Sequence, residues 1–378
     1  MAMPFTIHVP DQRLDEIRRK VEAYDWDQLA DAGGWRSGVG KADLQRLVKF
    51  WLNQFDWREV ERRLNRRPQF TTELDGQRLH FIHVAGNGTK PPLLLLHGWP
   101  GSFIEFEQMI DPLVADGHDV VVPSLPGFAF SHPIKGILGP IQIGELLHSL
   151  MVELFSEARY LVQGGDWGSE IATRMAYSHP QALLGIHLNM VPVAAADVRP
   201  TTTEEEEWQA RFAANGDRER GYSHEQGTRP QTLGVAMADS PVGAAAWILE
   251  KFGVWSDLPK RDDGSPDLWA LFSEEQLLTN IMLYVAPPVF VTATWIYQGE
   301  REEGADKIAA GTRVEVPTGV AAFPDPVFIP PPRSYAEKTY NITQWTEMPR
   351  GGHFAALEEP EQLLAELRRF IASVQKHH

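Results

Sequence analysis

The sequence predicts an α/β fold in which helices cover both faces of a mostly parallel β-sheet. Short apolar runs, each long enough for a buried strand, end in corners rich in glycine or proline, and stretches with helical periodicity separate them. Buried strands that alternate with helices are typical of a doubly wound parallel sheet. The four runs with their corners are PLLLLHGWPG (92–101), HDVVVPSLPG (118–127), RYLVQGGDWG (159–168) and LLGIHLNMVP (183–192).

An extension precedes the first of these runs. Residues 10–66 carry the periodicity of short helices, and Asp11 stands where it can cap the first of them. Residues 69–84 turn at Asp75-Gly76 between two alternating runs, which predicts a β-hairpin. We therefore assign residues 1–90 to a helical and meander extension that leads into the first strands.

The strand rhythm stops after the fourth run. Helical signals follow, among them an apolar helix at Pro241–Phe252 and a capping pattern at Ser273 before another apolar run. Strand patterns return at 312–321 and 342–349, an amphipathic helix ends the chain, and the charged stretch 301–307 predicts a solvated loop. These signals divide the rest of the chain into the first part of the core (91–192), a helical cap (193–283) and the second part of the core (284–378).

Composition excludes several classes of protein. The 378 residues carry 35 basic and 51 acidic side chains, a net charge of −16, which argues against general nucleic-acid binding. There is no cysteine, so a thiol nucleophile, a disulfide and a cysteine metal site are excluded. The N-terminus lacks the pattern of a signal peptide, and no apolar run approaches the ~20 residues that cross a membrane. We expect a cytoplasmic protein with no membrane partner.

The stretch QGGDWGS, residues 163–169, follows a predicted strand and resembles the G-x-S-x-G turn on which hydrolases mount a nucleophilic serine. Gly164 and Gly168 have the spacing of that turn, but Asp166 stands in place of the serine. A carboxylate here would lie at the N-terminus of the following helix, where the helix dipole favours a negative charge. Asp166 is therefore either a nucleophile or an ordinary helix cap.

A second corner strengthens the first interpretation. HGWPGS, residues 97–102, follows an earlier strand, so its backbone N–H groups should lie at the same edge of the sheet. In serine hydrolases, such a loop and the residue after the nucleophile together supply the oxyanion hole. The corresponding N–H groups here belong to Trp99 and Trp167, whose indole rings could equally serve to pack the core.

His353 follows the last predicted strand in MPRGGHFAALEEPE, where the pair Gly351-Gly352 predicts a loop. Most of the 13 histidines must be structural, but the position of this one in the chain is distinctive. Asp166, Asp325 and His353 follow the order nucleophile, acid and histidine of the α/β-hydrolase fold. Asp325 lies in the corner after the strand that begins near residue 312.

The chain resembles the microsomal-type epoxide hydrolase family over essentially its whole length. The motifs that carry the resemblance are GGDWGS, HGWPGSFIEF, GYSHEQGTRPQTLG, SPVGAAAWILEKF, PTGVAAFP and MPRGGHFAALEEPE. The sequence lacks the membrane anchor of the microsomal members, so it is similar to the soluble, bacterial-type members. Some of these act in natural-product pathways, including enediyne biosynthesis.

The resemblance implies an α/β-hydrolase fold with a helical cap, an aspartate nucleophile, a histidine base with an acidic partner, and two tyrosines that protonate the epoxide oxygen. Asp166 matches the nucleophile, His353 the base, and Tyr222 and Tyr297 the tyrosine pair. Trp99 and Trp167 match the oxyanion-hole positions. No metal or organic cofactor is implied; the partner is a small-molecule epoxide, and a homodimer is compatible with the family.

The acid position departs from the family pattern, in which a carboxylate lies three residues after the phenylalanine of PTGVAAFP. That position is Pro326 here, and Asp325 comes one residue early. We retain Asp325 because no other carboxylate lies between Glu315 and Glu337. If Asp325 does not reach His353, a carboxylate from another strand end would have to take its place.

The residue types suit the chemistry of an epoxide, whose electrophilic carbon is not a carbonyl. Attack by Asp166 would leave an alkyl ester whose carbonyl His353-activated water can then attack. A haloalkane dehalogenase uses the same nucleophile, but a departing halide needs N–H donors and no acid, so the tyrosines favour the epoxide. A non-catalytic ligand-binding protein on the same fold is the remaining alternative. The abundance of tryptophan and phenylalanine in the cap favours an apolar, aryl-substituted substrate.

Overall fold

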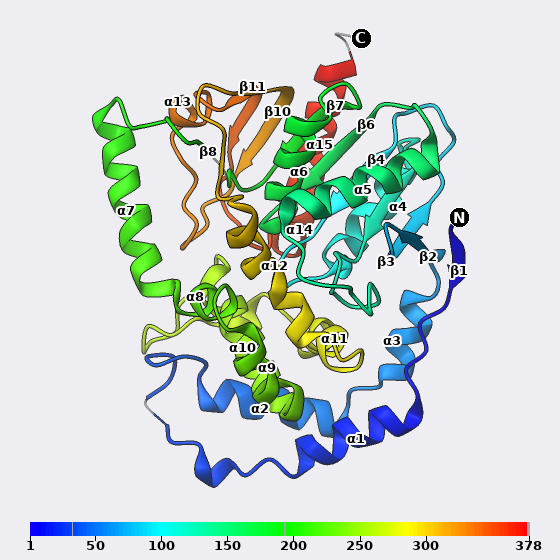
Figure 1. Cartoon of the computed structure of the whole chain (residues 1–378). Coiled ribbons are helices and arrows are strands. Elements are labelled where there is room, and N and C mark those ends of the chain that lie inside the picture. The colour runs from blue at the N-terminus through cyan, green and yellow to red at the C-terminus, as the bar shows by residue number, and fades with distance from the viewer. Residues whose placement is uncertain (32, 193, 376–378) are drawn as a thin grey trace.

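The computed structural model describes residues 1–31, 33–192 and 194–375, within which nine strands form one sheet (Figure 1). Their order is β1-β2-β3-β5-β4-β6-β7-β10-β11. Neighbours from β5 to β11 are parallel, whereas the first three strands are antiparallel to their neighbours. The strands are β1 (Met3–Phe5), β2 (Gln69–Leu74), β3 (Gln77–Val84), β4 (Leu93–Leu96), β5 (Val120–Pro123), β6 (Tyr160–Gly164), β7 (Leu183–Leu188), β10 (Val314–Ala322) and β11 (Tyr340–Glu347). The predicted mostly parallel sheet is confirmed.

The register of the central strands places the functional corners side by side. In β4 and β6, Leu93 pairs with Leu161 and Leu96 pairs with Gly164, so the two strands end together. Every residue of both strands is buried, as expected for parallel strands covered on both faces. The loops after β4 and β6 therefore leave the sheet at the same edge.

Four helices cover the sheet, with α5 and α6 in front of it and α15 behind it in Figure 1. Contacts join α5 to α6 and α4 to α15, and α6 also contacts β4, β6, β7 and β10. The four helices are α4 (Glu107–Ala115), α5 (Pro140–Phe155), α6 (Trp167–Ser178) and α15 (Pro360–Gln375). Two single-turn helices, α13 (Arg333–Ala336) and α14 (Ala355–Glu358), lie in the loops around β11.

A second, helical layer lies mostly below the sheet in Figure 1, and its first helix, α7 (Thr203–Glu219), descends along the left side of the molecule. The layer also comprises α8 (Gly221–Gln226), α9 (Pro230–Asp239), α10 (Pro241–Trp255), α11 (Glu274–Val285) and α12 (Phe290–Glu303). The N-terminal helices α1 (Asp11–Glu22) and α2 (Lys41–Asn53) contact α10, α2 also contacts α11, and α3 (Trp57–Leu64) leads back to the sheet. A short parallel pair, β8 (Ala194–Ala195) and β9 (Lys307–Ile308), joins the two ends of this layer.

The structure confirms the predicted cap at Ser273 and corrects two other local predictions, the cap at Asp11 and the loop 301–307. The Ser273 side chain caps α11 by accepting a hydrogen bond from the backbone N–H of Gln276. Asp11, in contrast, does not cap α1; Pro10 occupies the cap position, and the Asp11 carboxylate pairs with Arg58 instead. The predicted loop 301–307 is wrong at both ends: its first three residues continue α12, and Lys307 begins β9. The Glu303 carboxylate accepts N–H bonds from the start of α5.

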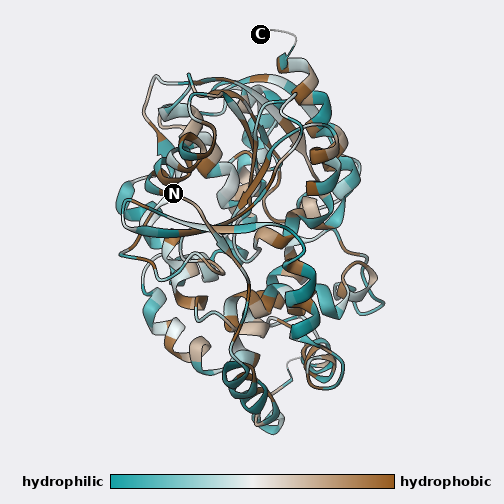
Figure 2. Ribbon diagram, turned by 90° about the vertical axis from the view of Figure 1, so that its right-hand side faces the viewer, coloured by the Kyte–Doolittle hydropathy of each residue, from teal (hydrophilic) through white to brown (hydrophobic). Residues whose placement is uncertain are grey.

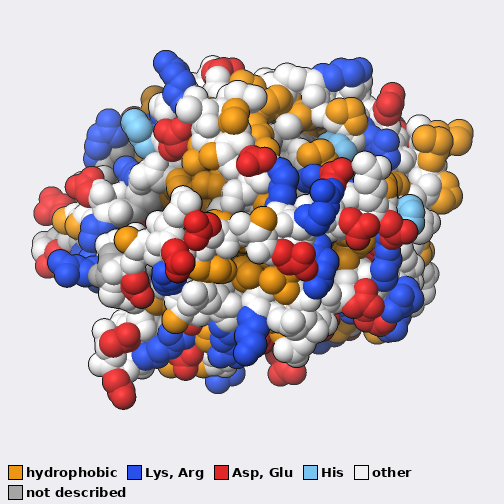
Figure 3. Space-filling model, turned by 90° about the horizontal axis from the view of Figure 1, so that it is seen from below, with side chains coloured by type: hydrophobic (Ala, Val, Ile, Leu, Met, Phe, Trp, Pro, Cys, Tyr) orange, Lys and Arg blue, Asp and Glu red, His pale blue; other side chains and the backbone are white. Residues whose placement is uncertain are grey.

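The core extends through both layers. Apolar residues follow the strands of the sheet and the inner faces of the helices (Figure 2). Seen from below, the outer face mixes acidic, basic and hydrophobic side chains (Figure 3). Within the described part of the chain, no single helix is long and apolar enough to cross a membrane. Two sharply bent helix pairs, α9 with α10 and α11 with α12, satisfy the requirements of length and composition only when each pair is taken together.

Candidate active site

Asp166 occupies a sharp turn between β6 and α6. Its φ of +48° and ψ of −130° are unusual for a residue with a side chain, and the helix begins directly after it at Trp167. The turn fits only because its neighbours lack side chains. A Cβ atom on Gly168 would lie 2.1 Å from the carbonyl oxygen of Leu96, and one on Gly98 would lie 2.1 Å from the Oδ1 atom of Asp166. The glycines of both motifs thus allow the two loops to meet.

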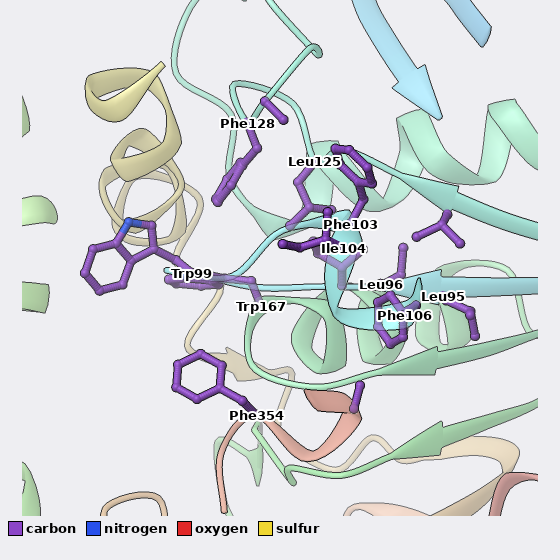
Figure 4. Packing of buried hydrophobic residues seen from close by; sticks show 14 of the residues in the cluster. Leu95, Leu96, Trp99, Phe103, Ile104, Phe106, Leu125, Phe128, Trp167 and Phe354 are labelled. Atoms are coloured by element: carbon purple, nitrogen blue, oxygen red, sulfur yellow. The ribbon is translucent and has the colours of Figure 1, made fainter. Parts of the chain in front are cut away.

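The loop after β4 binds one oxygen of the Asp166 carboxylate. The backbone N–H of Trp99 donates a 2.7 Å hydrogen bond to Asp166 Oδ1. The N–H of Trp167 is in the first turn of α6 and so has no partner within the helix. Figure 4 shows Trp99, Trp167 and Phe354 gathered beyond the ends of β4 and β6. Of the two predicted oxyanion donors, the structure thus shows the Trp99 N–H bound to the carboxylate, while the Trp167 N–H makes no bond to it.

His353 lies between two carboxylates. Its Nε2 atom is 3.3 Å from Asp166 Oδ2, and its Nδ1 atom is 2.8 Å from Asp325 Oδ2. The other oxygen of Asp325 accepts hydrogen bonds of 2.8 Å from the backbone N–H groups of Val327 and Phe328, which orient the carboxylate. Asp325 therefore reaches His353 despite its irregular position in the motif, and no carboxylate from another strand end is needed for this contact.

The loop that carries His353 is held by Glu358, a residue that the sequence analysis did not single out. Glu358 Oε2 accepts hydrogen bonds from the N–H groups of Asp257 and Gly352, and Oε1 accepts one from Phe354. Burial raises the pKa of Glu358 to about 7 against the opposing effect of these donors. The sequence shows a carboxylate five residues after His353, but no sequence pattern indicates that this side chain points toward the loop that carries His353.

Electrostatics favour the protonated form of His353. Burial would lower its pKa, but the close contact with Asp166, the hydrogen bond to Asp325 and the charges of both carboxylates raise the pKa to about 10. At neutral pH the imidazole is therefore an imidazolium between two carboxylates. This charge depends on Asp166 being ionised.

The two predicted tyrosines meet above the carboxylate, Tyr222 from α8 and Tyr297 from α12. Their rings pack edge to face, 5.7 Å apart. Tyr222 lies between the indole of Trp99, stacked 5.2 Å away, and the ammonium of Lys251, 4.6 Å from its ring centre. Burial raises the pKa of both hydroxyls well above 10, with Asp166 adding to the effect. Among the described residues, the buried hydroxyl of Tyr297 has no hydrogen-bond partner.

A cavity of about 320 Å³ opens beside these groups. Asp166, Trp167, Tyr222 and Tyr297 lie in its wall, so every group proposed for attack and protonation faces one space. Most of the wall is apolar or aromatic, including Trp208, Phe212, Val327, Phe328 and Ile329. The carboxyls of Glu170 and Glu300 interrupt it, and Glu219 and Arg220 add further charge at the end of α7. No local sequence pattern distinguishes Glu170 and Glu300 from the other acidic residues.

Glu105 is a further titratable group beside Asp166 and His353. Burial raises its pKa to about 8, and the Asp166 charge raises it further while His353 opposes the shift. With Asn189, Asp166 and His353, it lines a small cavity distinct from the large one. Within the described residues, no group of three or more His, Cys, Asp or Glu side chains is arranged to hold a metal ion.

The chain is similar to proteins and family models that are described as epoxide hydrolases. A family model described as "Epoxide hydrolase N terminus" matches residues 2–106, and one described as "alpha/beta hydrolase fold" matches residues 91–237. A protein of Stigmatella aurantiaca (strain DW4/3-1) that bears an epoxide hydrolase name is 39% identical over 97% of this chain and 83% of its own. Epoxide hydrolase 1 of Sus scrofa is 35% identical over 99% and 89%.

A solved structure extends the likeness to three dimensions. The epoxide hydrolase of Aspergillus niger has a TM-score of 0.85 and 30% identity, and the match covers 99% of this chain and 97% of that one. The architecture described above is thus the α/β-hydrolase fold, as the sequence predicts.

Proposed function

The chain belongs to the epoxide hydrolase family, and from this premise we propose that it converts an apolar, aryl-substituted epoxide to a vicinal diol through a covalent ester on Asp166. The observation that carries the proposal is the position of His353 between Asp166 and Asp325, beneath the two tyrosines. Tyr222 belongs to the predicted cap and Tyr297 to the first helix after it. A role in natural-product pathways of the enediyne type stays a prediction.

In the first step, Asp166 Oδ2 attacks an epoxide carbon, while Oδ1 stays bound to the Trp99 N–H. The new bond joins Oδ2 to carbon, the carbon–oxygen bond of the epoxide breaks, and the released oxygen takes a proton from Tyr222 or Tyr297. Because burial keeps both phenols protonated, they can act as acids at neutral pH. Esterification removes the negative charge of Asp166, so the pKa of His353 falls. The proton that His353 releases replaces the one that the tyrosine donated.

In the second step, neutral His353 takes a proton from water, and the hydroxide attacks the ester carbonyl carbon of Asp166. The negative charge that develops on Oδ1 is stabilised by the Trp99 N–H and by the adjacent N–H of Trp167. One such donor typically lowers the barrier by ~3 kcal/mol. The bond between the carbonyl carbon and Oδ2 then breaks, and Oδ2 leaves as an oxygen of the diol after taking the proton from His353. The new carboxyl group of Asp166, which contains the oxygen from water, returns its proton to His353 and restores the starting state.

The composition of the cavity supports an aryl substituent. Aromatic and aliphatic side chains dominate the wall beside Asp166, and removing apolar surface from water favours binding. A halide leaving group would have no need of the two phenols, which argues against haloalkane dehalogenation.

The proposal is tested by a single turnover of styrene oxide in heavy-oxygen water, with enzyme in excess. We expect the wild type to form diol without the label and to carry the label in the carboxyl of Asp166, because water attacks the enzyme and not the epoxide. Asp166→Ala should form no diol. Label in the first-turnover diol would refute the covalent route, and halide from a haloalkane without diol from the epoxide would refute the activity.

A further inference from the structure

The cavity wall contains two carboxyls without protein partners. Glu170 on α6 and Glu300 on α12 both line the cavity. Glu170 is only 7% exposed, and its Oε1 atom is buried without a hydrogen-bond partner. Among the described residues, neither side-chain carboxyl accepts a hydrogen bond or forms an ion pair. A buried carboxyl in that condition is costly, so its presence in an apolar wall calls for a ligand.

The charges around this pair do not neutralise it. Burial, followed by the charge of Glu300, raises the pKa of Glu170 well above its usual range. Burial and then Asp306 raise the pKa of Glu300 to about 6. Arg301 and Arg174 oppose the shift of Glu300, but neither forms an ion pair with the two carboxyls among the described residues. The guanidinium of Arg174 donates to the backbone carbonyls of Ala305 and Lys307 instead. The four carboxyl oxygens therefore offer more acceptor sites than nearby protein donors fill.

The position of the pair relative to the reacting groups follows from helical spacing. Glu170 lies four residues after Asp166 across the start of α6, and Glu300 lies three residues after Tyr297 on α12. Side chains three or four apart on a helix are neighbours on one face, with Cβ atoms about 5–6 Å apart. The Glu300 carboxyl thus lies about one helical turn from Tyr297, and Glu170 lies on the first turn of α6, directly after the sharp turn that holds Asp166.

We propose that Glu170 and Glu300 form a subsite for a hydrogen-bond donor, a hydroxyl or a protonated amine, carried by the substrate about one helical turn beyond the epoxide. The inference rests on the proposed function, because Asp166 and Tyr297 define where the epoxide lies. The remaining charged side chains of the wall, Glu219 and Arg220, lie at the end of α7, on a different element from Glu170 and Glu300. The substrate is then an aryl epoxide with one polar end.

Matched epoxides test the subsite. The para-ethyl and para-(hydroxymethyl) derivatives of styrene oxide have nearly the same shape, but only the second donates a hydrogen bond. We expect the wild type to favour the hydroxymethyl compound in kcat/KM by about tenfold, the usual effect of one hydrogen bond to a charged or buried acceptor. The para-(aminomethyl) compound tests the cationic donor, and the para-(methoxymethyl) compound, which cannot donate, should lose the advantage.

Variants locate the preference. Glu170→Leu and Glu300→Leu should each reduce the hydroxymethyl-to-ethyl ratio to about one or below, and Glu170→Gln, which still accepts a hydrogen bond, should retain part of it. Glu302→Gln removes an exposed carboxylate from the same helix and should leave the ratio unchanged. Circular dichroism of each variant checks its fold. Because the readout is a ratio, a general loss of activity does not mimic the effect.

The outcomes separate the two proposals. A wild-type ratio near one, or a ratio that both leucine variants preserve, would overturn the subsite while leaving Asp166-dependent turnover of styrene oxide intact. Failure of the wild type to convert styrene oxide would overturn the proposed function instead, and the subsite with it.

Discussion

The Nε2 atom of His353 lies 3.3 Å from the Oδ2 atom of Asp166. This contact makes the charge of the base depend on the state of the proposed nucleophile. While Asp166 is ionised, it helps to raise the pKa of His353 to about 10, and the imidazolium cannot accept a proton from water. Once Asp166 becomes an ester, that support is lost. Under the proposed mechanism, His353 therefore acts as a base only in the second step, where water must be activated.

Replacing His353 by glutamine should separate the two steps. His353→Gln leaves Asp166 able to attack the epoxide but removes the base that activates water, so the ester should accumulate. Intact-protein mass spectrometry after mixing with styrene oxide should show the added mass of one substrate. Asp166→Ala/His353→Gln should gain none. A single variant that never gains mass, while the wild type forms diol, would contradict the covalent mechanism.

Asp325 should affect mainly the second step. Its Oδ2 accepts from His353 Nδ1, whereas Oδ1 accepts from the N–H groups of Val327 and Phe328. In Asp325→Asn, the carbonyl can keep the two backbone bonds, so the amide NH₂ would face Nδ1 and force the wrong imidazole tautomer. By analogy with the serine-protease triad, we expect ester hydrolysis to slow by about 10³–10⁴-fold, with ester formation largely preserved.

Rapid-quench measurement of both steps checks this expectation. Asp257→Asn is the matched control, because Asp257 accepts the Gly351 N–H in the same region without contacting His353. An Asp325→Asn variant that hydrolyses its ester at the wild-type rate would remove Asp325 from the mechanism.

The sequence predicted the corners of the sheet because each short apolar run ended at a glycine or proline. Asp325 was harder to assign from a motif. It nevertheless meets His353, because β10 continues to Ala322 and the N–H groups of Val327 and Phe328 turn the carboxylate inward. Local patterns gave wrong predictions where a residue distant in the sequence binds the side chain. The Asp11 carboxylate pairs with Arg58 and does not cap α1, and the Glu303 carboxylate binds the start of α5 and does not lie in a loop.

The two unpartnered carboxyls could not be predicted for a different reason. The position of Glu170 in a helix after the proposed nucleophile was evident, but the side of the helix facing the cavity depends on how α7, α8 and α12 pack over the sheet. Glu300 lies in the stretch between the cap and the predicted loop, and no local pattern relates it to Glu170. Their common place in the wall is a consequence of tertiary packing alone.

Removing the phenols should slow ester formation. Tyr222→Phe and Tyr297→Phe each leave one proton donor, so we expect each to slow alkylation by about 10²-fold and the double variant to slow it further. Stopped-flow tryptophan fluorescence can report this step, since Trp99 and Trp167 contact the tyrosines. Tyr335→Phe, elsewhere in the cavity wall, is the control. Unchanged alkylation in the double variant would exclude both phenols as acids.

Buried neutral histidines should make the protein sensitive to acid, and His187 offers the clearest test. It is fully buried on β7, both ring nitrogens lack hydrogen-bond partners within the described residues, and burial lowers its pKa to about 3. The ordinary value in the unfolded chain is about 6.5. Below that pH the unfolded state binds a proton that the folded state refuses, so stability is present above pH 6.5 and lost as the pH falls toward 3.

His187→Leu removes this loss and also the two unpartnered nitrogens. Relative to the wild type, its free energy of unfolding should rise by about 1.4 kcal/mol for each pH unit below 6.5, or about 2 kcal/mol at pH 5. Urea unfolding at neutral pH and near pH 5 measures the difference, in which the other buried histidines cancel because both proteins contain them. His224→Gln, at an exposed position, should show no such change. A His187→Leu difference that is equal at the two pH values would show that His187 is not held neutral by the fold.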